Sequence, residues 1–180
     1  MRTIIALFVA IPLLLPVCAT PIEGDTTGHH IELLRDREYF AELVEAIDVA
    51  RSEVVMAFFL FKTQEGGKTP PDILLRHLLR AAHRGVAIRI LLERGKSAAS
   101  TVDKTNRETA RRLREQGIEV SFDTPRRTTH TKVVVIDRRY TFLGSHNLTS
   151  SALQYNHELS LVVDSPELAM ETLRYMDTLH

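Results

Sequence analysis

Apolar residues along this chain form short β-branched runs that alternate with longer segments of helical periodicity. The runs at 31–34, 54–61, 86–92, 118–122, 133–136 and 159–163 predict strands, because β-branched and aromatic residues favour extended backbone. Segments with apolar residues three or four apart predict helices after Asp36 as N-cap, from Pro70 to Gly85, from Asp103 to Gln116 and after Ser165. This alternation predicts one α/β domain, a mixed β-sheet sandwiched between helices.

The run 133–136 and the following run 140–143 predict an antiparallel hairpin that carries polar residues at both ends. Side chains alternate along a strand, so His130 and Lys132 point to the same face. An ammonium beside an imidazole repels a metal ion, but it suits a phosphate: a nucleophile or proton carrier lies next to a fixed positive charge. The Gly-Ser turn after the hairpin brings the Ser145 hydroxyl and the Asn147 amide towards an anion.

These residues form the pattern H-x-K-x4-D-x6-G-S-x-N from His130 to Asn147, and six specified positions rarely align by chance. At these positions the chain resembles the phospholipase D superfamily, and the resemblance extends from about Ile31 to about Asp164. In element order it is most similar to small bacterial endonucleases and cardiolipin-hydrolase-like members with one motif per chain. The resemblance implies a phospholipase D-like fold and a phosphodiesterase without metal or cofactor. One motif histidine attacks phosphorus, and another protonates the leaving oxygen.

In this interpretation His130 is the nucleophile and forms a phosphohistidine. Lys132 and Asn147 bind phosphate oxygens, and Ser145 and the turn backbone support the transition state. No trio of metal-binding side chains has catalytic ligand spacing, so the sequence predicts no metal site.

Two further acidic residues are assigned to the site. Asp137 lies on the strand face opposite His130 and Lys132, so we expect it to orient or lock the hairpin rather than react. Family members carry an acidic residue at the place of Glu158, which is the candidate to hold the His130 ring and fix its tautomer. The simpler alternative for Glu158 is an ordinary carboxylate at a strand end.

The overall charge does not indicate a substrate, because the 180 residues carry 23 basic and 23 acidic side chains. Basic residues nevertheless gather around the motif, and Arg126 and Arg127 directly upstream are candidates to contact a polyanion. A nucleic acid is therefore the preferred substrate. The alternatives are phospholipids such as cardiolipin or phosphatidylcholine, and an inactive module that keeps the site as an anion pocket.

The first residues predict an export signal. The apolar run 4–17 is too short for a comfortable membrane span, and Val17 and Ala19 fit a signal-peptidase site. Residues 1–19 are therefore the expected signal peptide, and 20–180 the mature domain, in the periplasm or secreted. An uncleaved anchor through 4–17 is the alternative. Cleavage would remove Cys18, the one cysteine, and would leave neither disulfides nor cysteine zinc sites.

One chain supplies a single H-x-K motif, whereas the implied chemistry needs a histidine on each side of phosphorus. A two-fold axis would bring two copies of His130 face to face. The sequence therefore predicts a homodimer with one shared active site.

Overall fold

A computed structural model describes residues 30–97, 100–124 and 126–179 of the chain; the expected leader and Cys18 lie outside them. The described residues form a seven-stranded mixed sheet with strand order β1-β7-β6-β5-β2-β3-β4. Strands β2, β3 and β4 run parallel, and β5 pairs antiparallel with both β2 and β6. Strand β7 continues the antiparallel half and pairs with β6 and β1.

The predicted strands and helices are all present, with ends within a few residues of the expected ones. The strands are β1 (His30–Arg35), β2 (Glu53–Phe58), β3 (Ala87–Leu92), β4 (Glu119–Phe122), β5 (Lys132–Ile136), β6 (Tyr140–Gly144) and β7 (Leu159–Asp164). The helices are α1 (Glu38–Val49), α2 (Pro70–His83), α3 (Thr101–Arg114), α4 (Ser150–Gln154) and α5 (Pro166–Met176).

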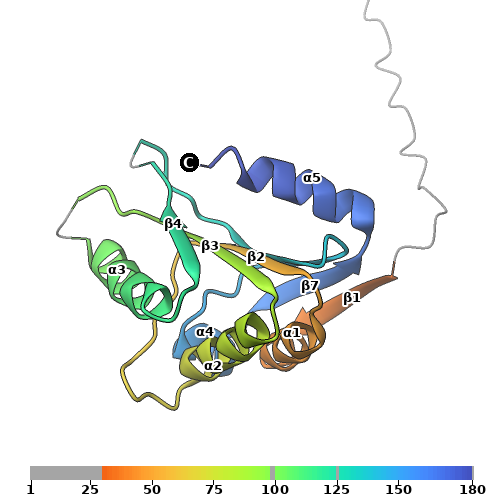
Figure 1. The fold of residues 1–180 in the computed structure, drawn as a ribbon, viewed down its shortest axis with the longest axis horizontal. Coiled ribbons are helices and arrows are strands. Elements are labelled where there is room, and N and C mark those ends of the chain that lie inside the picture. The colour runs from red at the N-terminus through yellow and green to blue at the C-terminus, as the bar shows by residue number, and fades with distance from the viewer. Residues whose placement is uncertain (1–29, 98–99, 125, 180) are drawn as a thin grey trace, which may run out of the picture.

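Helices cover both faces of the sheet, as the sequence predicted. Figure 1 shows α5 alone on one face and α1, α2 and α4 on the other. Alternate residues of β5 accordingly enter two cores: Val134 and Ile136 pack with α1, α2 and α3, and Val133 and Val135 pack against α5. Strand β5 is buried along its whole length, so its two ends hold fixed positions in the fold.

The predicted start of α1 is wrong. Asp36 does not cap the helix, which begins after Arg37 without a side-chain cap. Asp36 instead has a positive φ of 50°, and its carboxylate accepts a hydrogen bond from the Glu158 backbone N–H at 2.9 Å. The Asp36 N–H in turn donates to the Glu158 carbonyl, so this residue joins the end of β1 to the start of β7. None of the helices in the described part of the chain has the length and apolar character to span a bilayer.

Candidate functional site

The His130 and Lys132 side chains meet at the start of β5, as the strand periodicity predicted. The Lys132 Nζ lies 3.1 Å from His130 Nδ1 and 3.2 Å from Nε2, and it donates to the His130 carbonyl at 2.8 Å. His130 is exposed, whereas Lys132 is only 8% exposed. Burial lowers the pKa of Lys132, while the Glu158 carboxylate partly opposes this shift. An exposed imidazole thus stands beside a partly desolvated cation.

Phe59 forms the floor beneath this pair. Its ring centroid lies 4.7 Å from that of His130, and the Lys132 Nζ lies 5.3 Å from the same centroid. Phe58 and Phe61, on either side in the sequence, are fully buried, whereas Phe59 is only partly buried. A cation over an aromatic face is stabilised by the ring quadrupole.

The segment after β2 connects the two halves of the motif. The Phe59 N–H donates to the Thr131 carbonyl at 3.0 Å, next to His130. The Leu148 N–H, next to Asn147, donates to the Leu60 carbonyl at 3.0 Å. One short stretch of backbone therefore fixes the H-x-K and S-x-N segments relative to each other.

Asp137 joins the hairpin turn to the segment before β2, a position that agrees with its expected orienting role. Its Oδ1 accepts hydrogen bonds from the N–H and hydroxyl of Ser52, both at 2.8 Å, and from the Glu53 N–H at 3.1 Å; its Oδ2 accepts from the Arg51 N–H at 2.9 Å. Burial pushes the pKa of Asp137 upward, but the N–H donors of these three residues outweigh burial and lower it. Asp137 and Arg138 both have a φ of 53°, and Arg139 N–H closes the turn onto the Ile136 carbonyl.

Gly144 and Ser145, which the sequence assigned to phosphate binding, make contacts within the fold. A Cβ on Gly144 would lie 2.5 Å from the Leu159 carbonyl oxygen, so only glycine fits between the strands. The Ser145 N–H donates to the same carbonyl, and its hydroxyl donates to Glu158 Oε2. The turn amide of Ser145 is therefore engaged within the fold.

The expected contact between Glu158 and the His130 ring is not formed. The two Glu158 carboxylate oxygens accept from the Ser145 hydroxyl and from Asn156 Nδ2, the latter at 3.0 Å. The ring nitrogens of His130 face Lys132 instead. Glu158 acts on the site through its charge, which favours the protonated form of Lys132.

Asn147 carries unused hydrogen-bonding capacity. Its Oδ1 is buried and has no hydrogen-bond partner among the described residues. Buried polar atoms are nearly always paired in native proteins, so an unpaired one at a site marks a place for a ligand or water. An amide oxygen accepts hydrogen bonds, so the unpaired atom suits a donor such as water, and the predicted phosphate contact of Asn147 would have to come from its NH2 group.

His146, to which the sequence assigned no role, is a structural residue. It is fully buried, and its ring stacks on Tyr39 with centroids 4.4 Å apart. Nδ1 lies 2.7 Å from the Ser160 hydroxyl, and Nε2 lies 2.8 Å from the Asp36 carbonyl oxygen. Burial lowers the pKa of His146, although the Asp36 carbonyl opposes the shift. A histidine inside the motif thus anchors β1 and α1 to the Ser145–Leu148 segment.

The two upstream arginines are both exposed, but the structure places them differently. Arg127 lines a cavity of about 220 Å³ together with His130, Tyr175 and Thr178, whereas Arg126 is not among its lining residues. The geometry therefore brings Arg127 to the candidate site. The described residues contain no group of three or more His, Cys, Asp or Glu side chains that could hold a metal ion.

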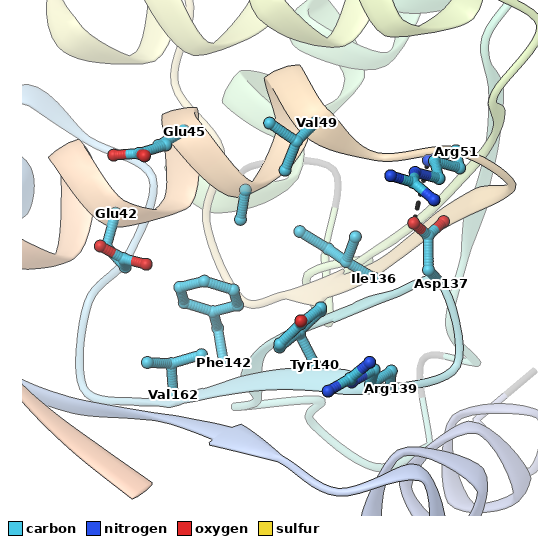
Figure 2. Close-up of a pocket in the computed structure, with 11 residues that line it drawn as sticks. Glu42, Glu45, Val49, Arg51, Ile136, Asp137, Arg139, Tyr140, Phe142 and Val162 are labelled. Atoms are coloured by element: carbon cyan, nitrogen blue, oxygen red, sulfur yellow. Dashed lines mark hydrogen bonds between the residues drawn. The ribbon is translucent and has the colours of Figure 1, made fainter. Parts of the chain in front are cut away.

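A larger cavity, of about 540 Å³, lies at the opposite end of β5 from His130. Figure 2 shows its apolar floor, with Phe142 and Val162, and the Glu42 and Glu45 side chains projecting from α1 above it. Asp137 stands at its rim and is joined to Arg51. Neither His130 nor Lys132 lines this cavity, so the motif residues place the candidate active site at the other end of β5, around His130 and Lys132.

The comparison with known families agrees with the motif and its geometry. The family model described as "Cardiolipin synthase, PLD-like domain" matches residues 43–180. The chain belongs to this family. The matched range includes the whole of the pattern from His130 to Asn147 and the supporting segment after β2.

Relatives and solved structures agree with this membership. Cardiolipin synthase A of Edwardsiella ictaluri is 28% identical over 156 residues, which cover 83% of this chain and 30% of that protein. That of Serratia proteamaculans is 29% identical over 150 residues, 80% of this chain and 29% of the relative. The chain thus spans about a third of the length of these relatives.

Two solved structures share the fold along nearly their whole length. Nuc from Salmonella typhimurium, described as a phospholipase D family member, superposes with a TM-score of 0.70 at 21% identity, covering 84% of this chain and 94% of that one. NucT from Helicobacter pylori gives a TM-score of 0.66 at 20% identity, covering 84% and 96%. The predicted phospholipase D-like fold is therefore confirmed.

One pair of residues near the site escaped the sequence analysis. Glu93 and Asp123 are each 4% exposed, and both accept a hydrogen bond from the N–H of Thr129, the residue before His130. A signal existed: each acid directly follows one of two neighbouring parallel strands. Carboxyl ends of adjacent parallel strands meet at one edge of a sheet, where sites commonly form.

Proposed function

We propose that this chain is a phosphodiesterase that works through a phosphohistidine on His130 and hydrolyses nucleic acid. The observation that carries the proposal is the exposed His130 ring beside the buried ammonium of Lys132. The ring offers a lone pair to phosphorus, and the ammonium balances negative charge on the phosphate oxygens as the transition state forms. The desolvated position of Lys132 strengthens this interaction relative to water.

The reaction consists of two displacements. A ring nitrogen of His130 forms the N–P bond, the P–O bond to the leaving group breaks, and the leaving oxygen takes a proton from a second imidazole. Water then attacks phosphorus, gives its proton to that second imidazole, and releases the phosphate group from His130. The NH2 group of Asn147 donates to a phosphate oxygen during both steps.

The second imidazole comes from another copy of the chain. His146 is buried in hydrogen bonds to Ser160 and Asp36 and stacked on Tyr39, so it is not free to reach phosphorus. A two-fold axis beside His130 supplies the missing acid in the simplest way, because it sets the same residue opposite itself. The homodimer with a shared site is thus part of the proposal.

Nucleic acid is the preferred substrate because of the cation next to the chemistry. Arg127 shares a hollow with His130, and Arg126 beside it is exposed, so a second phosphate along a polymer meets positive charge. The chain also shares its fold with Nuc and NucT.

A lipid substrate is the second candidate, and the sequence relatives favour it. The relatives of 28–29% identity bear the name cardiolipin synthase A. The same phosphohistidine yields a new phosphodiester when an alcohol, rather than water, attacks phosphorus. Hydrolysis of cardiolipin or phosphatidylcholine would follow the water route.

A substrate panel with an acid-quench step tests the proposal. The purified protein is incubated with single-stranded DNA, RNA, cardiolipin and phosphatidylcholine, beside His130→Asn as a folded, inactive control. We expect cleavage of nucleic acid and acid-labile phosphate on the protein, both absent from His130→Asn. Turnover of lipid alone would assign the lipid function. Binding of anions without turnover of any substrate would leave only an anion-binding module.

A further inference from the structure

Two buried carboxylates converge on the backbone just before His130. The Thr129 N–H donates to Glu93 Oε2 at 2.6 Å and to Asp123 Oδ2 at 3.1 Å, so oxygens from both side chains surround one donor. Asp123 Oδ1 has a donor of its own, the Arg94 N–H at 2.6 Å. Glu93 and Asp123 are each 4% exposed, so water does not separate the two charges.

Two ionised carboxylates at this spacing would repel one another strongly in a buried position. Carboxylate pairs that share a site relieve the repulsion by retaining one proton between them. Burial, followed by the hydrogen bond to Asp123, raises the pKa of Glu93 to about 7, while the Thr129 N–H and the Lys96 cation act in the opposite direction. The pair therefore holds a proton on the acid side of about pH 7 and loses it as the pH rises through that value.

Other charged groups surround the pair on several elements. Lys96 follows Glu93 in the same loop, and His130 and Arg127 lie on the segment of Thr129. On α3, Arg107 lies over the Phe122 ring, the neighbour of Asp123, and is paired with Asp103. Of these groups Lys96 acts to lower the pKa of Glu93, but burial and the hydrogen bond to Asp123 outweigh it.

The backbone of His130 is held on both sides. On the far side, Thr131 accepts from the Phe59 N–H at 3.0 Å, and its hydroxyl donates to the Ala57 carbonyl at 3.2 Å. Those bonds join neutral groups and do not change with pH. On the near side, the Thr129 N–H donates to two carboxyl groups, and the pKa of one of them, Glu93, is raised to about 7.

We propose that Glu93 and Asp123 are positioning residues for His130, which hold the Thr129 backbone as a pair that shares one proton. The inference rests on the proposed function of His130 as nucleophile. When both carboxylates ionise, repulsion separates them, and the amide they share loses one partner. The His130 ring then moves relative to Lys132, and displacements of about 1 Å at a reacting group lower rates by as much as about 100-fold.

The first test compares pH profiles of kcat on a small chromogenic phosphodiester, from about pH 5 to about pH 9. Glu93→Gln keeps an oxygen for the Thr129 N–H and gives Asp123 a permanent N–H donor, so it imitates the protonated pair. We expect the wild type to lose about tenfold more kcat than Glu93→Gln above about pH 7, with KM unchanged. Glu119→Gln, an exposed glutamate on β4, should retain the wild-type profile. Identical profiles for Glu93→Gln and wild type would overturn the proposal.

The second test needs no turnover. Infrared difference spectra between acidic and alkaline pH should show the C=O stretch of a protonated carboxyl group that disappears through about pH 7. The band should be missing at neutral pH from both Glu93→Gln and Asp123→Asn, with thermal unfolding as the check that each variant folds. If the wild type shows the band but cleaves no phosphodiester, the proposed function is wrong, while the proton shared by Glu93 and Asp123 is still supported. Absence of the band from the folded wild type would refute the positioning pair.

Discussion

Replacing Asp137 by Ala should destabilise the protein by about 3 kcal/mol and leave kcat unchanged. The carboxylate accepts four hydrogen bonds from residues 51–53, at 2.8 to 3.1 Å. Three of the donors are backbone N–H groups, which would lose this acceptor. Because Asp137 stands at the far end of β5 from His130, its loss should reduce the stability of the fold without removing a reacting group.

The magnitude follows from the number of donors and their exposure. Hydrogen bonds to a charged group contribute about 1.5–3 kcal/mol each when buried, but water replaces part of this at a half-exposed turn, so we take about 1 kcal/mol per N–H. Asn tolerates the φ of 53° and retains one acceptor, so Asp137→Asn should lose about half as much. Ser52→Ala removes the hydroxyl bond alone and should cost about 1 kcal/mol.

Urea unfolding followed by circular dichroism measures these changes, and about 3 kcal/mol corresponds to a melting temperature lower by roughly 6–12 °C. The pH dependence gives an independent check. Since the folded pKa of Asp137 lies below its ordinary value, its stabilisation is complete above about pH 4 and is lost as the pH falls through the folded pKa. This acid-sensitive part should be absent from Asp137→Asn. A stable, folded Asp137→Asn without turnover would show that the residue takes part in the chemistry.

Three further predictions concern the reaction. Turnover should survive EDTA, because Lys132 supplies the positive charge that a metal would give; loss on chelation and recovery with a divalent ion would contradict this. Arg126→Ala with Arg127→Ala should lower the log–log salt slope of nucleic-acid binding by about 0.7–0.9 for each lost phosphate contact, whereas the exposed Lys104→Ala should leave it unchanged. Wild-type chains refolded with three parts of His130→Ala should retain about one sixteenth of full activity if two chains share a site, and about one quarter if each chain acts alone.

The sequence predicted the parts of the site that depend on local geometry. Strand periodicity placed His130 and Lys132 on one face, and the contacts of Lys132 with the ring confirm it. The same periodicity placed Asp137 on the opposite face as a residue that orients or locks the hairpin, but it did not predict the donors on residues 51–53. Those donors lie about 85 positions away and become neighbours only because β2 pairs with β5.

The errors arose where side chains respond to strand pairing at long range. Asp is a residue type favoured at helix N-caps, which is why Asp36 was expected there. The antiparallel pairing of β1 with β7 instead places the Glu158 N–H against the Asp36 carboxylate. The Glu158 carboxylate accepts a hydrogen bond from Ser145 rather than from His130, because β6 and β7 are paired. His146 is placed by the same pairing against Ser160. Periodicity along one strand carries no information about the neighbouring strand, so these partners were beyond sequence reasoning.

The spacing of the motif follows from the strand that carries it. Four buried residues separate Lys132 from Asp137, so at about 3.4 Å per residue the chemistry and the lock lie roughly 17 Å apart. Strand β5 pairs on both sides, with β2 and β6, and therefore cannot slide along either one without breaking both ladders. Inserting one residue into β5 would have one of two effects. If Lys132 kept its place, Asp137 would move beyond the N–H groups of residues 51–53. If Asp137 kept its place, Lys132 would point to the opposite face of the sheet, against α5. The interval between Lys132 and Asp137 is thus set by the length of β5.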